Sequence, residues 1–358
     1  MEVKDKTGGI VAPETHQVTR AVNRGRFLKP CPGTPRHVCC GYHVIHFAQG
    51  CTLGCTYCIL NKYFDLDRPV LFTNTADLFA ELERAIHGSP VDCTTDDGYP
   101  GGCSPDCGVP GTGIQRYGTG EFADSLLFEE LLPLHAGLVR FFARQDRAVL
   151  EIKTKTTGSD GLLDAPEKDN VIMAWSLNSQ PAALREEPGA PSPAERIVAA
   201  RRAQDAGYRL AFHFDPLILH PGWEEAYPGI IDLLFSVVDP RRVVYISMGT
   251  VRFMPEMREQ LHKNGAGFLC SGEFVRGEDN KMRYFRPLRT EMYRRIRRSL
   301  ERHVDPDILY LCMERTEVWE DVFGEESMSS HRLARRLDAA CLRLFPKLAP
   351  NKSPPGGG

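Results

Sequence analysis

The chain has 358 residues, of which 42% are apolar and 25% charged, enough for one large domain or two small ones. Its net charge of −3 excludes a protein that is basic all over, so nucleic acid would need a local patch. No apolar run approaches the roughly 20 residues that span a bilayer, and no apolar signal-peptide core follows the first residues. We therefore expect a cytoplasmic protein with no membrane contact.

Cysteine content narrows the chemistry of the chain. Its 12 cysteines are too sparse for a secreted disulfide scaffold and favour metal binding or redox chemistry. Residues 1–41 show little periodicity and are predicted to be an N-terminal lead-in. Cys31, Cys39 and Cys40 lie near its end. They are either small buried residues beside the first strand, or a second metal site or redox pair.

An apolar run over residues 42–47 predicts the first strand, and a short glycine-punctuated loop follows it. This loop carries Cys51, Cys55 and Cys58 in the spacing C-x3-C-x2-C. Three thiolates can converge on one inorganic centre, whereas a disulfide would leave one thiol over. Iron–sulfur cubanes normally take four cysteines, so three local ligands would leave one iron open. A zinc knuckle and three unrelated core cysteines are the alternatives.

The next elements are a short strand over residues 70–73 and a helix that begins near residue 75 and has apolar residues at helical spacing. Residues 88–114 then lose all periodicity and are rich in glycine, proline and aspartate, which predicts a loop insertion. The insertion contains Cys93, Cys103 and Cys107. Their spacings match no standard zinc pattern, and a second metal there remains one of two alternatives.

From residue 114 onward, strands and helices alternate. We predict strands over 114–118, 148–155, 171–177, 209–219 and 242–248, and helices over 124–144, 193–206, 223–238 and 255–263. Alternation at this spacing is typical of βαβ units and a mainly parallel sheet. Residues 307–312 predict a last strand, 330–345 a closing helix, and 351–358 a disordered tail.

Polar residues and glycines gather where these strands end, and active sites of barrels form at such ends. The candidates are Gly118, Gly120, Glu121, Lys153, Lys155, Ser176, Asn178, His213 and Asp215. Glycines let a backbone approach a ligand closely. Ser176 and Asn178 offer hydroxyl and amide groups that suit a ribose or a carboxylate. The alternatives are a generic turn, solvated lysines and a core histidine at position 213.

The cysteine loop, with Tyr57 before its last cysteine, resembles the signature of radical S-adenosylmethionine (SAM) enzymes. The order of this loop, Lys155, the segment 175–179, the segment 206–210 and the segment 220–224 resembles the spore photoproduct lyase-like family. The resemblance covers roughly residues 42–315. It implies a partial (β/α)6 radical SAM barrel over residues 42–265, a C-terminal extension over 266–346 and a tail over 347–358.

This resemblance also implies an activity and its residues. The family cleaves SAM reductively to a 5'-deoxyadenosyl radical and reverses a methylene-linked thymine dimer in DNA. Cys51, Cys55 and Cys58 would hold a [4Fe–4S] cluster. The residues implied at SAM are Gly118, Gly120, Glu121, Lys155, Ser176 and Asn178, and the catalytic candidates are Tyr57 and Glu121. A reductant of the flavodoxin or ferredoxin type would supply electrons.

Two departures from the family put the reaction in question. The lyase's hydrogen-donating cysteine falls at Glu121 or a neighbour here, and no cysteine lies between Cys107 and Cys270. Ile59 replaces an aromatic residue of the same relay. Either a distant thiol replaces the donor, among Cys39, Cys40, Cys103, Cys107 and Cys270, or the reaction differs, as we expect. The alternatives are a radical SAM enzyme that modifies a peptide or small molecule, and a non-catalytic, metal-containing nucleic-acid-binding protein.

A basic stretch extends from Lys281 to Arg302, with Tyr284, Phe285 and Tyr293 interleaved among its arginines. Its first half, residues 274–286, predicts a hairpin, and its second half predicts a helix. Arginines with aromatics suit phosphate contact and base stacking, so this stretch is our candidate DNA surface. The alternative is a basic helix that balances the acidic residues 314–326.

Overall fold

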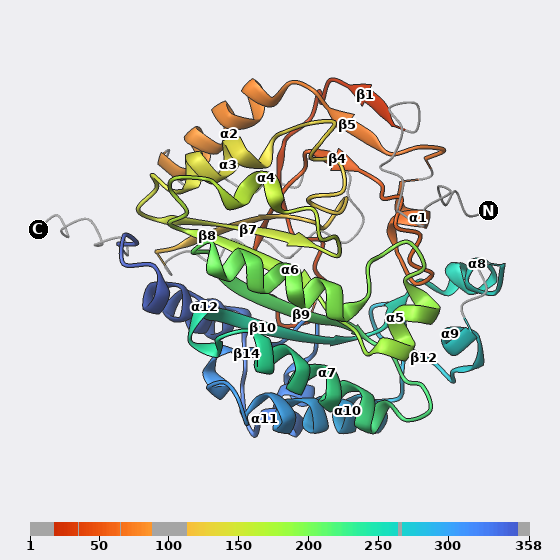
Figure 1. The fold of residues 1–358 in the computed structure, drawn as a ribbon. Helices are drawn as coiled ribbons and strands as arrows, with labels where there is room; N and C mark the ends of the chain where they lie inside the picture. Colours follow the sequence, from red (N-terminus) through yellow and green to blue (C-terminus); the bar gives the residue numbers. More distant parts are fainter. Residues whose placement is uncertain (1–17, 35, 65, 88–112, 264–266, 350–358) are drawn as a thin grey trace, which may run out of the picture.

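The computed structural model describes residues 18–34, 36–64, 66–87, 113–263 and 267–349. The cysteines of the predicted insertion and the end of the tail lie outside the described residues. Within the described part, the main sheet has eight strands in the order β14-β10-β9-β8-β7-β6-β3-β2. The strands from β3 to β14 run parallel, and β2 pairs antiparallel with β3 at one edge. The result is a mixed α/β fold whose sheet is curled into a half-barrel (Figure 1).

The strands of this sheet are close to the predicted ones. They are β2 (Leu28–Pro30), β3 (His43–Ile45), β6 (Gln115–Thr119), β7 (Ala148–Thr154), β8 (Val171–Ser176), β9 (Arg209–Leu217), β10 (Val243–Thr250) and β14 (Leu309–Leu311). Every residue of β8 and β10 is buried. Strands buried on both faces read as continuous apolar runs, which is why these central strands were predictable.

Helices cover the outer face of the half-barrel (Figure 1). Residues of the inner face line a cavity. The longer ones are α2 (Thr75–His87), α3 (His135–Phe142), α6 (Pro193–Asp205), α7 (Trp223–Val237), α10 (Arg286–Leu300), α11 (Thr316–Phe323) and α12 (Ser330–Leu344). Helix α6 begins with a capping box. The Ser192 hydroxyl accepts a hydrogen bond from the backbone N–H of Glu195, and the Glu195 carboxylate accepts one from the backbone N–H of Ser192. None of the helices in the described ranges is long and apolar enough to cross a membrane.

The shorter helices are α1 (Leu60–Tyr63), α4 (Asp160–Leu163), α5 (Gln180–Glu186), α8 (Arg258–Lys263) and α9 (Gly267–Ser271). The sequence analysis missed α5, which lies between β8 and α6, because its seven residues carry little periodicity. Ser179 caps this helix by accepting a hydrogen bond from the backbone of Ala182. The end of α5 turns out to hold the cysteine loop.

The predicted helix over residues 124–144 is wrong in its first half. Helix α3 begins only at His135, two residues after Pro133, whose ring is tolerated near the start of a helix and not in its interior. The carboxylate of Asp124 accepts hydrogen bonds from the backbone of Leu126 and Lys155 and from the Thr154 hydroxyl. These bonds tie residues 124–127 to the end of β7, so the segment cannot wind into a helix.

Two small sheets complete the fold. The first joins β1 (Thr19–Ala21), β5 (Val70–Phe72) and β4 (Ala48–Gln49), so part of the predicted lead-in is ordered structure. The second joins β11 (Arg252–Phe253), β13 (Met282–Arg283) and β12 (Val275–Arg276). Strands β12 and β13 pair antiparallel, which confirms the predicted hairpin.

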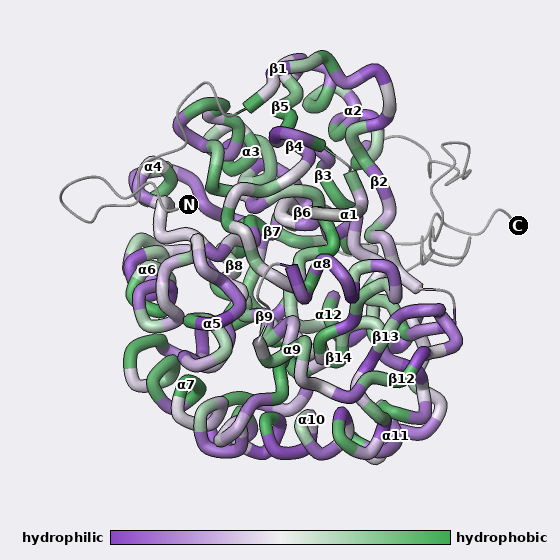
Figure 2. The backbone as a smooth tube through the Cα atoms, turned by 90° about the vertical axis from the view of Figure 1, so that its right-hand side faces the viewer, coloured by the Kyte–Doolittle hydropathy of each residue, from purple (hydrophilic) through white to green (hydrophobic). Residues whose placement is uncertain are grey.

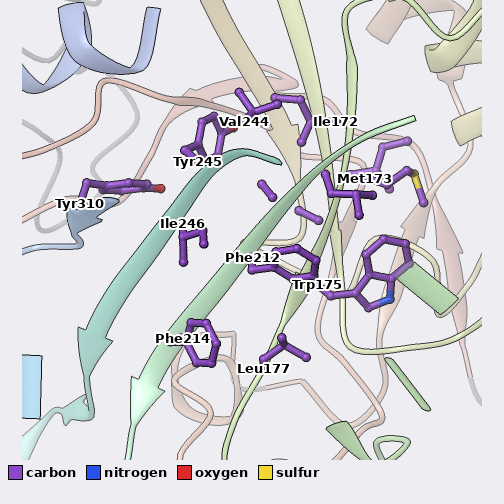
Figure 3. Close-up of a cluster of buried hydrophobic side chains, with 14 of the residues drawn as sticks. Ile172, Met173, Trp175, Leu177, Phe212, Phe214, Val244, Tyr245, Ile246 and Tyr310 are labelled. Carbon is purple, nitrogen blue, oxygen red and sulfur yellow. The ribbon is translucent and has the colours of Figure 1, made fainter. Parts of the chain in front are cut away.

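Side chains alternate across the half-barrel and separate an apolar face from a polar one. Phe212 and Phe214 of β9 lie beside Trp175 and Leu177 of the neighbouring strand region and are fully buried (Figure 3). Between them in sequence, His213 faces the opposite side. The hydropathy colouring of Figure 2 shows hydrophobic strands inside the molecule and a largely hydrophilic α10 at its lower edge.

Candidate active-site cavity

The cysteine loop follows β4 and lies at one side of a large cavity. Gly50 and Gly54 adopt positive φ angles of 85° and 65°, a conformation that favours glycine. The backbone N–H of Cys58 donates to the carbonyl of Cys55 at 3.1 Å, which closes the turn that carries both thiols. Cys55 is buried, whereas Cys51 and Cys58 are partly exposed. The three thiols lie close enough for the charge of one to raise the pKa of another.

The segment after α5 holds this loop in place. The backbone N–H of Thr56 donates to the carbonyl of Glu186 at 2.9 Å, and the Thr56 hydroxyl donates to the carboxylate of the same residue. The N–H of Gly189 donates to the carbonyl of Leu53 at 3.0 Å. A Cβ atom at Gly189 would lie only 2.5 Å from that carbonyl oxygen. The loop is therefore docked, backbone against backbone, on a segment that follows β8.

A buried ion pair fixes Tyr57 beside the cysteines. The Tyr57 hydroxyl donates to Glu187, whose other carboxylate oxygen pairs with Arg196 of α6. Glu187 is 2% exposed and Arg196 fully buried. Burial alone would raise the pKa of Glu187, but Arg196 and then Lys155 outweigh it and lower this pKa. Tyr57 is therefore held by an ionised carboxylate and stays a phenol, since burial and Glu187 raise its pKa.

The three thiols fit a cluster better than a single metal ion. Within the described residues, no three Cys, His, Asp or Glu side chains converge closely enough to bind one ion, and this covers Cys31, Cys39 and Cys40 as well. A zinc site requires four ligands around one atom. Cysteines that hold a cubane bind different irons, so their sulfurs lie further apart. Burial raises the pKa of Cys55 to about 12 while Lys155 opposes this, so ligation would have to displace protons.

The cavity has a volume of about 1300 Å³ and is lined by residues from both the cysteine loop and the inner face of the sheet. Of the predicted site residues, its lining includes Tyr57, Cys58, Gly120, Glu121, Lys155 and Ser176. The structure therefore brings most of the candidates to one space. Small-molecule pockets usually enclose about 300–1000 Å³, so this cavity has room for two ligands.

Four predicted site residues do not line the cavity: the predicted cluster ligands Cys51 and Cys55, and Gly118 and Asn178, which were predicted at SAM. A Cβ atom at Gly118 would overlap the ring of Tyr42, so the backbone there faces a protein side chain. Asn178 is 1% exposed, and its amide binds Glu187, the Pro216 carbonyl and the Tyr227 hydroxyl. Strand β8 ends at Ser176, so the alternation that placed Asn178 on the same face does not continue.

The two lysines after β7 differ in their partners. Lys153 forms an ion pair with Glu121, and although burial opposes it, this carboxylate and Glu151 raise the pKa of Lys153. Lys155 lies with its ammonium 5.8 Å from the centre of the Tyr57 ring. No carboxylate among the described residues lies within ion-pair distance of Lys155. An anionic ligand group would find this cation accessible.

Thiols remote in sequence also line the cavity: Cys40, one of the distant thiols considered as a donor, and Cys31 and Cys312, which were not. Cys31, Cys40 and Cys312 lie in its wall, whereas Cys270 on α9 does not. Burial, followed by Glu121 and the neighbouring cysteines, raises the pKa of Cys31 well above its usual value. Arg252 donates to the Cys312 sulfur at 3.6 Å and forms a two-bond ion pair with Asp215. Nothing in the spacing of these cysteines indicates that β14 brings them together.

The basic stretch is mostly engaged within the protein. Arg283 pairs with Asp279, Arg286 with Asp321, Arg289 with Glu314, Arg295 with Glu225, Arg297 with Glu301, Arg298 with Glu291 and Arg302 with Asp232. Arg294 donates to the Asp321 carbonyl. Lys281 differs: it lines the cavity and donates to the Thr34 hydroxyl at 2.9 Å.

Comparisons with known proteins agree on one family. The family described as "Spore photoproduct lyase" matches residues 113–263, a segment that includes the strands around the cavity. Spore photoproduct lyase from Geobacillus sp. (strain Y412MC61) is 28% identical over 187 residues, 52% of this chain and 48% of that protein. Its counterpart from Bacillus subtilis (strain 168) is 25% identical over 226 residues, 62% of this chain and 60% of that protein. The matches thus span about half of each relative.

Solved structures of spore photoproduct lyase resemble this fold over most of its length. A mutant solved with dinucleoside spore photoproduct has a TM-score of 0.66 and 22% identity, covering 82% of this chain and 81% of that one. Another mutant, with bound AdoMet and dinucleoside spore photoproduct, has a TM-score of 0.65 and 21% identity over the same shares. At this identity, the likeness establishes the shared half-barrel architecture.

Proposed function

Because this chain belongs to the spore photoproduct lyase-like family of radical SAM enzymes, we propose that it cleaves SAM reductively and acts on a thymine-dimer lesion of DNA. The observation that carries the proposal is the single cavity that joins the cysteine loop to the strand ends. A [4Fe–4S] cluster there supplies the electron that converts SAM to methionine and a 5'-deoxyadenosyl radical. We interpret β3 to β10 as the (β/α)6 barrel and β14 as part of the extension.

The residues around the cavity would each bind or orient part of the reacting system. Cys51, Cys55 and Cys58 would hold the cluster, and their partial burial would exclude water from it. Lys155 would bind the carboxylate of SAM, because it is the predicted site cation without a carboxylate partner in the described part of the chain. Ser176 would donate a hydrogen bond from the neighbouring strand. Tyr57, fixed by Glu187, would pack beside the bound SAM.

The substrate proposal rests on the relatives and on the size of the cavity. Structures of relatives hold dinucleoside spore photoproduct, in one case together with AdoMet. A volume of about 1300 Å³ would hold SAM and a second ligand together. Lys281, at the hairpin, would approach the DNA backbone. The arginines of α10 would contribute little to DNA binding, because they already have partners within the protein. Because these arginines are engaged within the protein, a peptide or small molecule is the alternative substrate.

A thiol of the cavity wall would supply the hydrogen atom that the product radical requires. Of the distant thiols considered, Cys40 reaches the cavity, and Cys31 and Cys312 join it there. Their raised pKa values keep the S–H bonds intact at neutral pH. Each donation would leave a thiyl radical, which one electron and one proton from the reductant system would restore. We propose a flavodoxin or ferredoxin as that reductant, and a cytoplasmic location.

The test is an anaerobic assay of the reconstituted protein with dithionite and SAM, which measures 5'-deoxyadenosine and thymine released from lesion-containing DNA. We expect deoxyadenosine from the wild type and none from Cys51→Ala, Cys55→Ala or Cys58→Ala. Cys270→Ala, outside the cavity, is the matched control and should retain activity. A wild type with full iron content that forms no deoxyadenosine would refute the proposal. Deoxyadenosine without thymine would support the alternative substrates.

A further inference from the structure

A row of polar side chains crosses the floor of the cavity. The strand register aligns Ser176 of β8 with His213 of β9, His213 with Ser247 of β10, and Ser247 with Tyr310 of β14. All four residues line the cavity. Neighbouring strands lie about 4.8 Å apart, so the row extends about 14 Å from the predicted SAM contact toward Cys312. The row therefore leads from Ser176, a predicted SAM contact, along the cavity wall to Tyr310.

His213 lies at the centre of this row between a carboxylate and a hydroxyl. Its Nδ1 atom is 2.7 Å from the Ser247 hydroxyl, and its Nε2 atom is 3.3 Å from the carboxylate of Glu151 on β7. The Tyr245 hydroxyl donates to the other oxygen of Glu151 at 2.6 Å. Glu151, His213 and Ser247 are 4%, 7% and 1% exposed. Side chains on three strands thus form one buried polar row, in which His213 is hydrogen-bonded to Ser247 through Nδ1 and faces Glu151 at ion-pair distance through Nε2.

Burying polar groups costs folding stability wherever their hydrogen-bonding atoms are not all paired, and Nε2 of His213 has no hydrogen-bond partner among the described residues. The apolar face of the same strands already supplies the core, so the fold does not require these groups (Figure 3). Burial would raise the pKa of Glu151, but His213 and then Lys153 and Tyr245 lower it to about 2. The carboxylate is therefore ionised at neutral pH, and it lies 3.3 Å from the Nε2 atom of His213.

We propose that Glu151, His213 and Ser247 form a proton relay that binds a carbonyl oxygen of the substrate ring and lends it a proton during turnover. This proposal rests on the proposed radical SAM function and names a residue set for its substrate. Ser247 contacts the substrate, and His213 and Glu151 act through it. A pyrimidine ring, which carries carbonyl groups on its edge, is the substrate group that such a row recognises.

The relay moves protons only, so it requires no electron donor. With the imidazole protonated, Nε2–H points to Glu151 and Nδ1–H donates to the Ser247 oxygen, which leaves the Ser247 hydrogen for the ligand. When the carbonyl gains electron density, the Ser247 O–H bond breaks and an O–H bond forms on the substrate. The Nδ1 proton moves to Ser247, and the imidazole becomes neutral. The steps reverse when the ring carbonyl is restored.

The relay is tested with dinucleoside spore photoproduct in the anaerobic assay, comparing the wild type with Ser247→Ala and His213→Gln. Glutamine keeps hydrogen bonding but cannot be protonated near neutral pH. We expect thymine formation to fall about 100-fold in both variants, the usual contribution of a positioned proton donor, while deoxyadenosine formation without substrate stays within about twofold. Ser247→Thr, which keeps the hydroxyl, should restore thymine formation. Ser236→Ala, on the exposed face of α7, is the control.

Unchanged thymine formation in both variants would overturn the relay. So would a parallel loss of deoxyadenosine, because it would indicate a structural role. Absence of deoxyadenosine from the wild type would instead refute the proposed function. In that case, or if the wild type forms no thymine, the binding of thymidylyl-thymidine decides the matter. We then expect Ser247→Ala to bind it about tenfold more weakly than the wild type. Equal affinity, or no binding by the wild type, would overturn the proposal.

Discussion

At the scale of single residues, charge partners distinguish the cations of this cavity. Lys153 and Arg252 have carboxylate partners, whereas Lys281 has a hydroxyl. Burial, followed by Arg252, lowers the pKa of Lys281 to about 8, and Arg283 adds to this while Asp279 and Cys312 oppose it. The folded protein therefore holds a lysine that the unfolded chain would keep charged to a higher pH. Such a group is poised to receive an anion.

We predict that Lys281 makes folding stability depend on pH in the alkaline range. Between about pH 8 and 10 the unfolded chain binds more protons at this residue than the folded one, so the free energy of unfolding rises with pH. Lys281→Met should lack this increment. Urea unfolding at pH 7, 8, 9 and 10 measures the difference between the two proteins, and Lys263→Met, an exposed lysine on α8, is the control. A constant difference between wild type and Lys281→Met would contradict the prediction.

The buried pair of Glu187 and Arg196 supports the site from behind. Arg196→Met would leave a buried carboxylate uncompensated and should cost about 3–5 kcal/mol of folding stability. Tyr57 would lose its fixed acceptor at the same time. Chemical denaturation measures the loss. Arg201→Met, which removes the exposed pair with Asp205, is the control and should change stability far less, because solvent screens exposed pairs. Equal losses of stability in Arg196→Met and Arg201→Met would refute the stabilising role of the buried pair.

At the scale of elements, the cysteine loop depends on a segment more than 120 residues away in sequence. Glu186, the last residue of α5, and Gly189, which follows this helix, hold the backbone of the loop. The sequence indicated the three cysteines through their spacing, because ligand spacing within one loop is a local property. It did not indicate which segment the loop packs against, because a contact between two backbones leaves no periodic pattern of side chains in the sequence.

We predict that Gly189→Ala displaces the cysteine loop. The new methyl group would lie 2.5 Å from the Leu53 carbonyl oxygen and 3.1 Å from the Leu53 Cα, and backbone cannot yield as a flexible side chain can. Iron bound after anaerobic reconstitution should fall severalfold. Gly229→Ala on α7 is the matched control, because nothing lies within 4 Å of its added carbon. Full iron content in Gly189→Ala would show that the contact is dispensable.

At the scale of the whole molecule, the arrangement of helices α7, α10 and α11 decides what the basic stretch does. Helix α10 packs between acidic partners from α7 and α11, and its arginines bind them or nearby carbonyls. The sequence could count these positive charges, but not their partners, which lie as far as 70 residues away. The alternative of a basic helix that balances residues 314–326 therefore holds for part of α10. Arg286, Arg289 and Arg294 bind that stretch. Arg295, Arg297 and Arg298 bind acidic residues elsewhere.

We predict that the exposed arginines of α10 contribute little to DNA binding. Each phosphate contact adds about 0.9 to the slope of log affinity against log salt concentration for duplex DNA. Arg298→Gln, whose partner is Glu291, should leave this slope unchanged, whereas Lys281→Gln at the cavity should reduce it by about 0.9. Titrations with labelled lesion-containing duplex at several salt concentrations measure both slopes. A reduced slope in Arg298→Gln would contradict the prediction and show that α10 contacts DNA.

The sequence by itself determined the alternating strands and helices, the hairpin, the cysteine loop and the family, because each is written in local spacing or in an ordered set of motifs. It placed Glu121, Lys155 and Ser176 at the ends of strands, and the structure brings these three to one cavity. It also placed Asn178 on the same face as Ser176, which the structure does not show, because the strand ends two residues before Asn178. Only the tertiary structure gathered Cys31, Cys40 and Cys312, paired the arginines and aligned His213 with Ser247. Those contacts depend on strand order and register, which join residues that no local pattern relates.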